Sequence, residues 1–160
     1  MAAKPQEVRV AVINGPNLDL LGRREPDVYG DVTLAEIEER LQVLALELGV
    51  ELETFQSNAE GALIDYIHEA GSRTDAFLVN GGGLTHTSVS LRDALTGVGR
   101  PFVEVHLTNP SARELFRHTS LLSDVALGAV VGFGAESYVL GLRGLVARLQ
   151  STARAADRGS

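Results

Sequence analysis

Short β-favouring segments alternate along the chain with longer segments whose apolar residues recur every three or four positions. The segments that we expect to be strands are 8–13, 50–56, 76–79, 101–107 and 125–133. The three-and-four spacing between and after them predicts helices that follow Thr33 and Ser57 and that cover about 89–95 and 135–150. The sequence therefore predicts five strand–helix units.

Capping signals support the helix boundaries. Thr33 and Glu36 have the spacing of a capping box, and Gly49 stands where the same helix would end. Ser57 and Glu60 offer a second possible capping box before the next helix. These signals favour a first long helix with one buried face and a second that begins near Glu60.

Strict alternation of strands and helices indicates a parallel sheet, because parallel strands need long crossover connections and these are usually helical. We expect an α/β, flavodoxin-like fold: a five-stranded parallel sheet with helices on both faces. Ligands of such sheets bind beyond the carboxyl ends of the strands. Here those ends lead into segments 14–32, 57–60, 80–88 and 106–118.

Length and composition narrow the class of protein. The 160 residues fit a single catalytic domain, 1–160, in which a polar leader at 1–7 and a tail at 151–160 are expected to be flexible. The formal charge of −7 argues against nucleic-acid binding, and no apolar stretch is long enough to span a membrane, so we expect a cytoplasmic protein. The chain has no cysteine, and its single lysine is Lys4 in the leader, which excludes thiolate chemistry and a core Schiff base.

The segment after the first strand, 14–30, is unusually long for a strand–helix connection and can form a lid. It carries Tyr29 with Arg23 and Arg24 close before it in the sequence. A cation near a phenol favours its ionised form, which is a usable base. The alternative is that the tyrosine ring only closes the loop and that the arginines are solvated.

Two further strand ends carry candidate groups. Asn80 and three glycines form a turn that can present backbone N–H groups to an anion, or can simply be a tight turn. In the fourth strand Glu104 and His106 are two residues apart and share a face, so the carboxylate can orient the imidazole as a general acid. Alternatively, His106 only packs at the strand end. The histidines lack the spacing of metal ligands, so we expect no metal.

Taken together, these motifs resemble those of the type II dehydroquinases, the 3-dehydroquinate dehydratases. The resemblance spans about residues 8–149 and is carried by NGPNLDLLGRREPDVYG (14–30), QSNAEG (56–61), NGGGLTHTSVSLRDAL (80–95), EVHLTN (104–109) and ARELFRH (112–118). It implies a flavodoxin-like hydro-lyase of the shikimate and quinate routes that needs no metal or organic cofactor. The dehydroquinases that form an imine use a lysine, and the lysine count independently excludes their mechanism.

The resemblance also implies catalytic roles. Tyr29 would remove a proton from carbon 2 of 3-dehydroquinate, Arg24 would favour the ionised form of that tyrosine, and Asn17 would hold the water that stabilises the enolate. His106, oriented by Glu104, would protonate the departing hydroxyl to give 3-dehydroshikimate.

Substrate binding and assembly follow from the same resemblance. The ring oxygens of the substrate would be bound by Asn80, His86 and Arg117, and its carboxylate by the backbone N–H groups of Leu107 and Thr108. Family members usually form a dodecamer of trimers, and Asp93 would assist at the site from a neighbouring subunit.

Three other functions stay open at this point. An inactive, dehydroquinase-like binding or scaffold protein is suggested by Asp19 and Gly81, which depart from the family pattern. A flavin carrier would share the fold, although the long first loop departs from a short phosphate turn. A Ser/His hydrolase is disfavoured because no Gly-x-Ser-x-Gly elbow is present.

Overall fold

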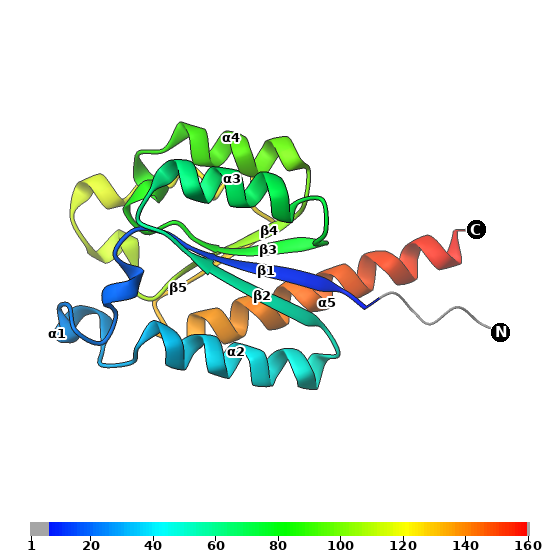
Figure 1. Cartoon of the computed structure of the whole chain (residues 1–160), viewed down its shortest axis with the longest axis horizontal. Coiled ribbons are helices and arrows are strands. Elements are labelled where there is room, and N and C mark those ends of the chain that lie inside the picture. The colour runs from blue at the N-terminus through cyan, green and yellow to red at the C-terminus, as the bar shows by residue number, and fades with distance from the viewer. Residues whose placement is uncertain (1–6, 160) are drawn as a thin grey trace.

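The computed structural model describes residues 7–159 and contains one parallel sheet covered by helices on both faces (Figure 1). The strand order is β2-β1-β3-β4-β5. The strands are β1 (Arg9–Asn14), β2 (Glu51–Gln56), β3 (Ala76–Asn80), β4 (Phe102–His106) and β5 (Gly128–Val131). The expected α/β, flavodoxin-like architecture is confirmed. The predicted leader at 1–7 lies, except for Glu7, outside the described residues.

Two layers of helices enclose the sheet. In Figure 1, α2 and α5 lie against one face, and α3 and α4 lie against the other. Their bounds are α2 (Leu34–Leu48), α3 (Glu60–Ala70), α4 (Val89–Val98) and α5 (Glu136–Arg158); a single turn, α1 (Pro26–Tyr29), lies in the first loop. Among the described residues, no helix is long and apolar enough to cross a membrane.

Successive side chains of a strand point to opposite faces of the sheet, and this produces two separate apolar cores. Val10 and Val12 of β1 face α2 and α5, whereas Ala11 and Ile13 face α3 and α4. All four side chains are buried because parallel strands in the middle of such a sheet have no solvent face. The same alternation puts successive residues at the carboxyl ends of β3 and β4 on opposite faces of the sheet.

The capping prediction for α2 is confirmed, and the second one is wrong. Thr33 accepts a hydrogen bond from the N–H of Glu36, and the Glu36 carboxylate accepts one from the N–H of Thr33. α3 instead has Ala59 at its N-cap, without a side-chain cap, because the Ser57 hydroxyl accepts a hydrogen bond from the N–H of Ala59.

Two other expectations need correction. The connection between β4 and β5 has no α-helix among the described residues; short 3₁₀ turns at Pro110–Ala112 and Leu115–Arg117 take its place, so the five strand–helix units become four. α5 does not end near Gln150 but runs to Arg158 and projects beyond the sheet (Figure 1). The side chains of its last two turns are exposed, so no buried apolar face marks this part of the helix. These turns contain three alanines, and alanine has the highest intrinsic helix propensity.

Candidate active site

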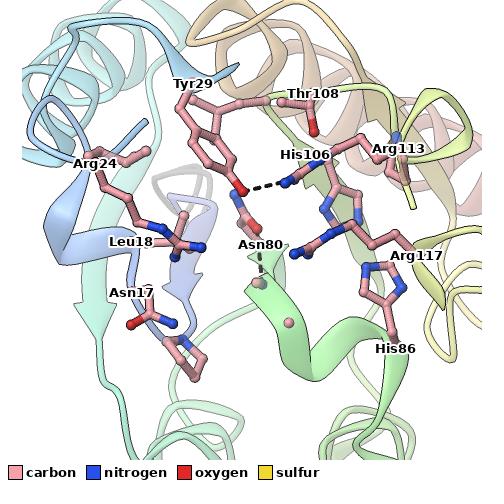
Figure 2. Close-up of a pocket in the computed structure, with 16 residues that line it drawn as sticks. Asn17, Leu18, Arg24, Tyr29, Asn80, His86, His106, Thr108, Arg113 and Arg117 are labelled. Carbon is pink, nitrogen blue, oxygen red and sulfur yellow. Dashed lines mark hydrogen bonds between the residues drawn. The ribbon is translucent and has the colours of Figure 1, made fainter. Parts of the chain in front are cut away.

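A pocket opens at the carboxyl edge of the sheet, where the predicted segments meet (Figure 2). Three stretches of the chain line it: the first loop, the end of β3 with the turn that follows, and the end of β4 with segment 107–119, which we call the strap. The residues are Pro16, Asn17, Leu18, Leu21, Arg24, Tyr29, Asn80, Gly82, Gly83, His86, His106, Leu107, Thr108, Pro110, Arg113 and Arg117. Segment 57–60, which was also expected here, contributes none of them.

The Tyr29 hydroxyl is held by an arginine that the sequence analysis did not select. Tyr29 ends the one-turn helix α1, and Nη1 of Arg113 donates a hydrogen bond to its hydroxyl at 2.8 Å. Arg24, the expected partner, has its guanidinium carbon 5.8 Å from the ring centroid, against 5.1 Å for Arg113. The phenol therefore lies between two cations, and among the described residues only Arg113 donates a hydrogen bond to its oxygen (Figure 2).

Asn17 is fixed by a neighbouring loop. Its backbone is left-handed (φ 68°), which asparagine tolerates better than most residues. Its N–H donates to Oδ1 of Asn58 at 2.8 Å, and Nε2 of Gln56 donates to the same oxygen. Residues of the QSNAEG motif thus hold the backbone of Asn17 in place, although none of them lines the pocket.

Glu104 and His106 form the predicted pair. Nε2 of His106 lies 2.7 Å from Oε1 of Glu104, which is almost fully buried. The hydroxyls of Ser120 and Ser123 also donate to this carboxylate. Burial alone raises the pKa of Glu104, but the hydrogen bonds from His106, Ser123 and Ser120 outweigh it and lower the pKa overall. The carboxylate binds Nε2 and leaves Nδ1 as the nitrogen that a substrate can reach.

The second histidine of the pocket is oriented by the strap. His86 donates from Nδ1 to the carbonyl of Thr119 at 2.8 Å, since a carbonyl can only accept. Its ring lies 6.4 Å from that of His106, with 19° between the planes. Because Nδ1 is bonded to the strap, Nε2 is the nitrogen of His86 that can bind a ligand.

Glu114 orients the arginines of the strap. Its carboxylate accepts from Nε of Arg117 at 2.7 Å and lies 3.8 Å from Nε of Arg113. A backbone hydrogen bond has the largest effect on the pKa of Glu114 and lowers it, and the ion pairs with Arg117 and Arg113 lower it further. Binding through Nε leaves the terminal nitrogens of Arg117 available to an anion or to hydroxyl groups.

Asn80, Leu107 and Thr108 all line the pocket as expected, whereas Asp93 does not. Asp93 is exposed on α4 and contributes nothing to the pocket of its own chain. Asp19, which departs from the family pattern, is exposed and also outside the lining. Gly81 makes room for a neighbour: a Cβ there would lie 2.7 Å from Oγ1 of Thr85.

The geometry and the comparisons together identify the chain. A phenol between guanidiniums and an imidazole bound to a carboxylate, at the carboxyl edge of a parallel sheet, define an α/β enzyme of the acid–base class. The family model of class II dehydroquinases matches residues 8–146. The chain belongs to the class II dehydroquinase family.

Relatives and solved structures agree. The chain is 59% identical over 146 residues to the 3-dehydroquinate dehydratase of Gloeobacter violaceus, covering 91% of each chain. It is 57% identical over 143 residues to that of Synechococcus sp. WH7803, covering 89% of this chain and 97% of the relative. The type II dehydroquinase structure from Propionibacterium acnes superimposes with a TM-score of 0.83 at 37% identity, over 88% of this chain and 99% of that one. These matches confirm the resemblance and give no support to the inactive alternative.

Proposed function

We propose that this pocket eliminates water from 3-dehydroquinate through an enolate, with Tyr29 as the general base and His106 as the general acid. Family membership makes the chain a 3-dehydroquinate dehydratase, a hydro-lyase of the shikimate pathway. One arrangement supports the assignment of roles: the Tyr29 hydroxyl bound to Arg113 and the His106 ring bound to Glu104 line the same pocket.

The first step is proton abstraction. A proton next to a ketone is acidic enough for a phenolate, so the Tyr29 oxygen takes it from carbon 2 and the electron pair forms the enolate. Arg113 binds the phenol oxygen and Arg24 lies beside the ring, so positive charge faces the oxygen that takes the proton. Asn17, at the wall of the pocket, holds a water against the enolate oxygen.

The second step is loss of the hydroxyl on carbon 1. Protonated His106 gives its proton to that oxygen, the carbon–oxygen bond breaks, and water leaves as the enolate collapses to the conjugated enone. Glu104 stabilises the imidazolium and holds Nε2, so that Nδ1 faces the substrate. The proton on Tyr29 then returns to His106 through solvent, which completes the cycle.

The remaining polar groups bind the substrate. Asn80, His86 and Arg117 hold the ring oxygens, and the backbone of Leu107 and Thr108 holds the carboxylate. The chain carries a net charge of −7, so the arginines of the pocket must supply the local positive potential that attracts an anionic substrate.

We also propose a dodecamer of trimers in which Asp93 completes the site of a neighbouring subunit. Asp93 and Val89 lie one turn apart on α4, both exposed. Leu115 and Phe116 on the strap are 82% and 67% exposed, which is high for apolar residues and favours coverage by another subunit. Light scattering tests the assembly. Co-expression of Asp93→Ala and Tyr29→Phe chains tests the shared site, because mixed oligomers would regain activity only if Asp93 acts in trans.

The activity itself is tested with purified protein and 3-dehydroquinate. The ultraviolet absorbance of the conjugated enone should rise, and the rate should be the same after dialysis against a chelator. A preparation that binds 3-dehydroquinate without forming the enone would contradict the proposal. We further propose a cytoplasmic location for this biosynthetic activity, which cell fractionation tests.

A further inference from the structure

A buried chain of hydrogen bonds connects α5 to the pocket. The hydroxyl of Tyr138 donates to Oδ1 of Asn14 at 2.6 Å and accepts from Nδ2 of Asn80 at 2.9 Å. Tyr138 and Asn14 are completely buried, and Asn80 is 3% exposed although it lines the pocket. None of the catalytic steps above uses Tyr138.

The backbone fixes the direction of this chain. The N–H of Gly82 donates to Oδ1 of Asn80 at 3.1 Å, so the amide nitrogen of Asn80 must face the other way, toward Tyr138. Because that nitrogen donates to the phenol oxygen, the single phenol hydrogen must point to Asn14. Burial raises the pKa of Tyr138, so the phenol keeps this hydrogen.

The packing of α5 brings the phenol to the strand ends. Gly141 lies three residues beyond Tyr138 on the same helix face, and a Cβ there would lie 2.8 Å from Val105 and 2.9 Å from Leu78. The absence of a side chain lets α5 approach the sheet closely at this point. The Tyr138 hydroxyl thereby reaches between the ends of β1 and β3.

We infer that Tyr138 is a positioning residue: its hydroxyl fixes the orientation of the Asn80 amide and thereby the hydrogen bond that Asn80 makes to the ring oxygens of the substrate. The inference rests on the substrate-binding role proposed for Asn80. An amide held at its oxygen by Gly82 and at its nitrogen by Tyr138 cannot rotate, so its remaining N–H and lone pair keep fixed directions toward the pocket.

Tyr138→Phe tests this with the ring packing preserved. Because Asn80 binds the substrate but takes part in neither proton transfer, KM should rise about 3- to 10-fold while kcat changes less than about twofold. Tyr66→Phe is the matched control: its hydroxyl is also hydrogen bonded, to Glu53 at 2.6 Å, but it does not line the pocket, so KM and kcat should both be retained. A Tyr138→Phe enzyme with an unchanged KM would overturn the inference.

The double variant shows whether Tyr138 acts through Asn80. In an Asn80→Ala background, Tyr138→Phe should cause no further rise in KM, and multiplied effects would contradict the inference. If Asn80→Ala alone leaves KM unchanged, the binding role of Asn80 fails and the inference falls with it. If Asn80→Ala raises KM and Tyr138→Phe does not, only the inference fails.

A second variant covers the case in which Tyr138→Phe does not fold. Asn14→Ala keeps the phenol but removes the acceptor of its hydrogen. Without that acceptor, the phenol hydrogen can turn toward the Asn80 amide and displace its N–H. KM should therefore rise while kcat changes little. An unchanged KM in folded Asn14→Ala would count against the inference in that case.

Discussion

Nη1 of Arg113 donates to the hydroxyl of Tyr29 at 2.8 Å, although 84 positions separate the two residues. The contact joins the first loop to the strap after β4 and closes the pocket between them. The guanidinium of Arg113 therefore contacts the phenol oxygen itself, whereas that of Arg24 faces the ring.

Removing the Arg113 guanidinium should weaken the base. A hydrogen bond from a charged donor contributes about 1.5–3 kcal/mol, so Arg113→Met should lower kcat by about 10- to 100-fold in the enone assay. Arg143→Met is the control, because Arg143 is exposed on α5, outside the pocket, and its guanidinium lies 3.9 Å from the Glu47 carboxylate. Equal rates for wild type and Arg113→Met would show that the hydrogen bond does not support catalysis.

The carboxylate behind His106 should matter for turnover. Glu104→Gln keeps the shape but removes the charge that stabilises an imidazolium, so kcat should fall by about 10- to 100-fold. Ser123→Ala leaves the charge in place and removes one donor, so its effect should be smaller. A loss of kcat in Ser123→Ala as large as that in Glu104→Gln would show that hydrogen bonding to the carboxyl group, and not its charge, supports His106.

Glu104 should also contribute to the stability of the protein in acid. Its pKa is below the ordinary value of 4.5 in the folded state. A carboxyl group with a depressed folded pKa stabilises the fold above its unfolded pKa, and this stability is lost as the pH falls through the folded pKa. Denaturation of Glu104→Gln between about pH 6 and 3 should therefore show a shallower loss of stability than the wild type. Parallel curves would contradict the assigned shift.

Gly15 follows β1 and packs against Gly81, which follows β3, so this contact should tolerate no side chain at Gly15. A Cβ there would lie 2.4 Å from the carbonyl oxygen of Gly81, and backbone atoms cannot easily move away. Gly15→Ala should destabilise the protein by about 1–3 kcal/mol or more, measured by urea unfolding. Gly61→Ala has open space on α3 and should be neutral or stabilising by about 0.5 kcal/mol. Equal effects of the two variants would show that the backbone at Gly15 and Gly81 can move to accept a side chain.

The fold was largely predictable because its signals are local. Apolar runs, the capping box at Thr33 and the glycine at position 49 are read directly from neighbouring residues, and all three have the expected structure. The end of α5 was missed because a helix that buries nothing has no apolar stripe. The count of five strand–helix units was one too high because crossovers are usually helical, whereas the connection after β4 forms 3₁₀ turns at Pro110–Ala112 and Leu115–Arg117.

The site was predictable only in part, for a similar reason. Glu104 and His106 were paired correctly because two residues apart in a strand share a face. The partner of Tyr29 depends on how two distant loops pack, and no spacing in the sequence records that. Arg113 lies four residues before Arg117 in the same motif, which was the one available signal. Tyr138 reads as an ordinary core residue of α5 until Asn14 and Asn80 are seen around its hydroxyl.

The central claim is that the oxygen of Tyr29 removes the proton from carbon 2. Tyr29→Phe keeps the ring between its arginines and removes only that oxygen, so the variant should bind 3-dehydroquinate with a Kd within a few-fold of the KM of the wild type. A general base contributes about 10²–10⁴-fold, and kcat for enone formation should fall at least that far. A Tyr29→Phe enzyme that keeps the wild-type kcat would contradict the account.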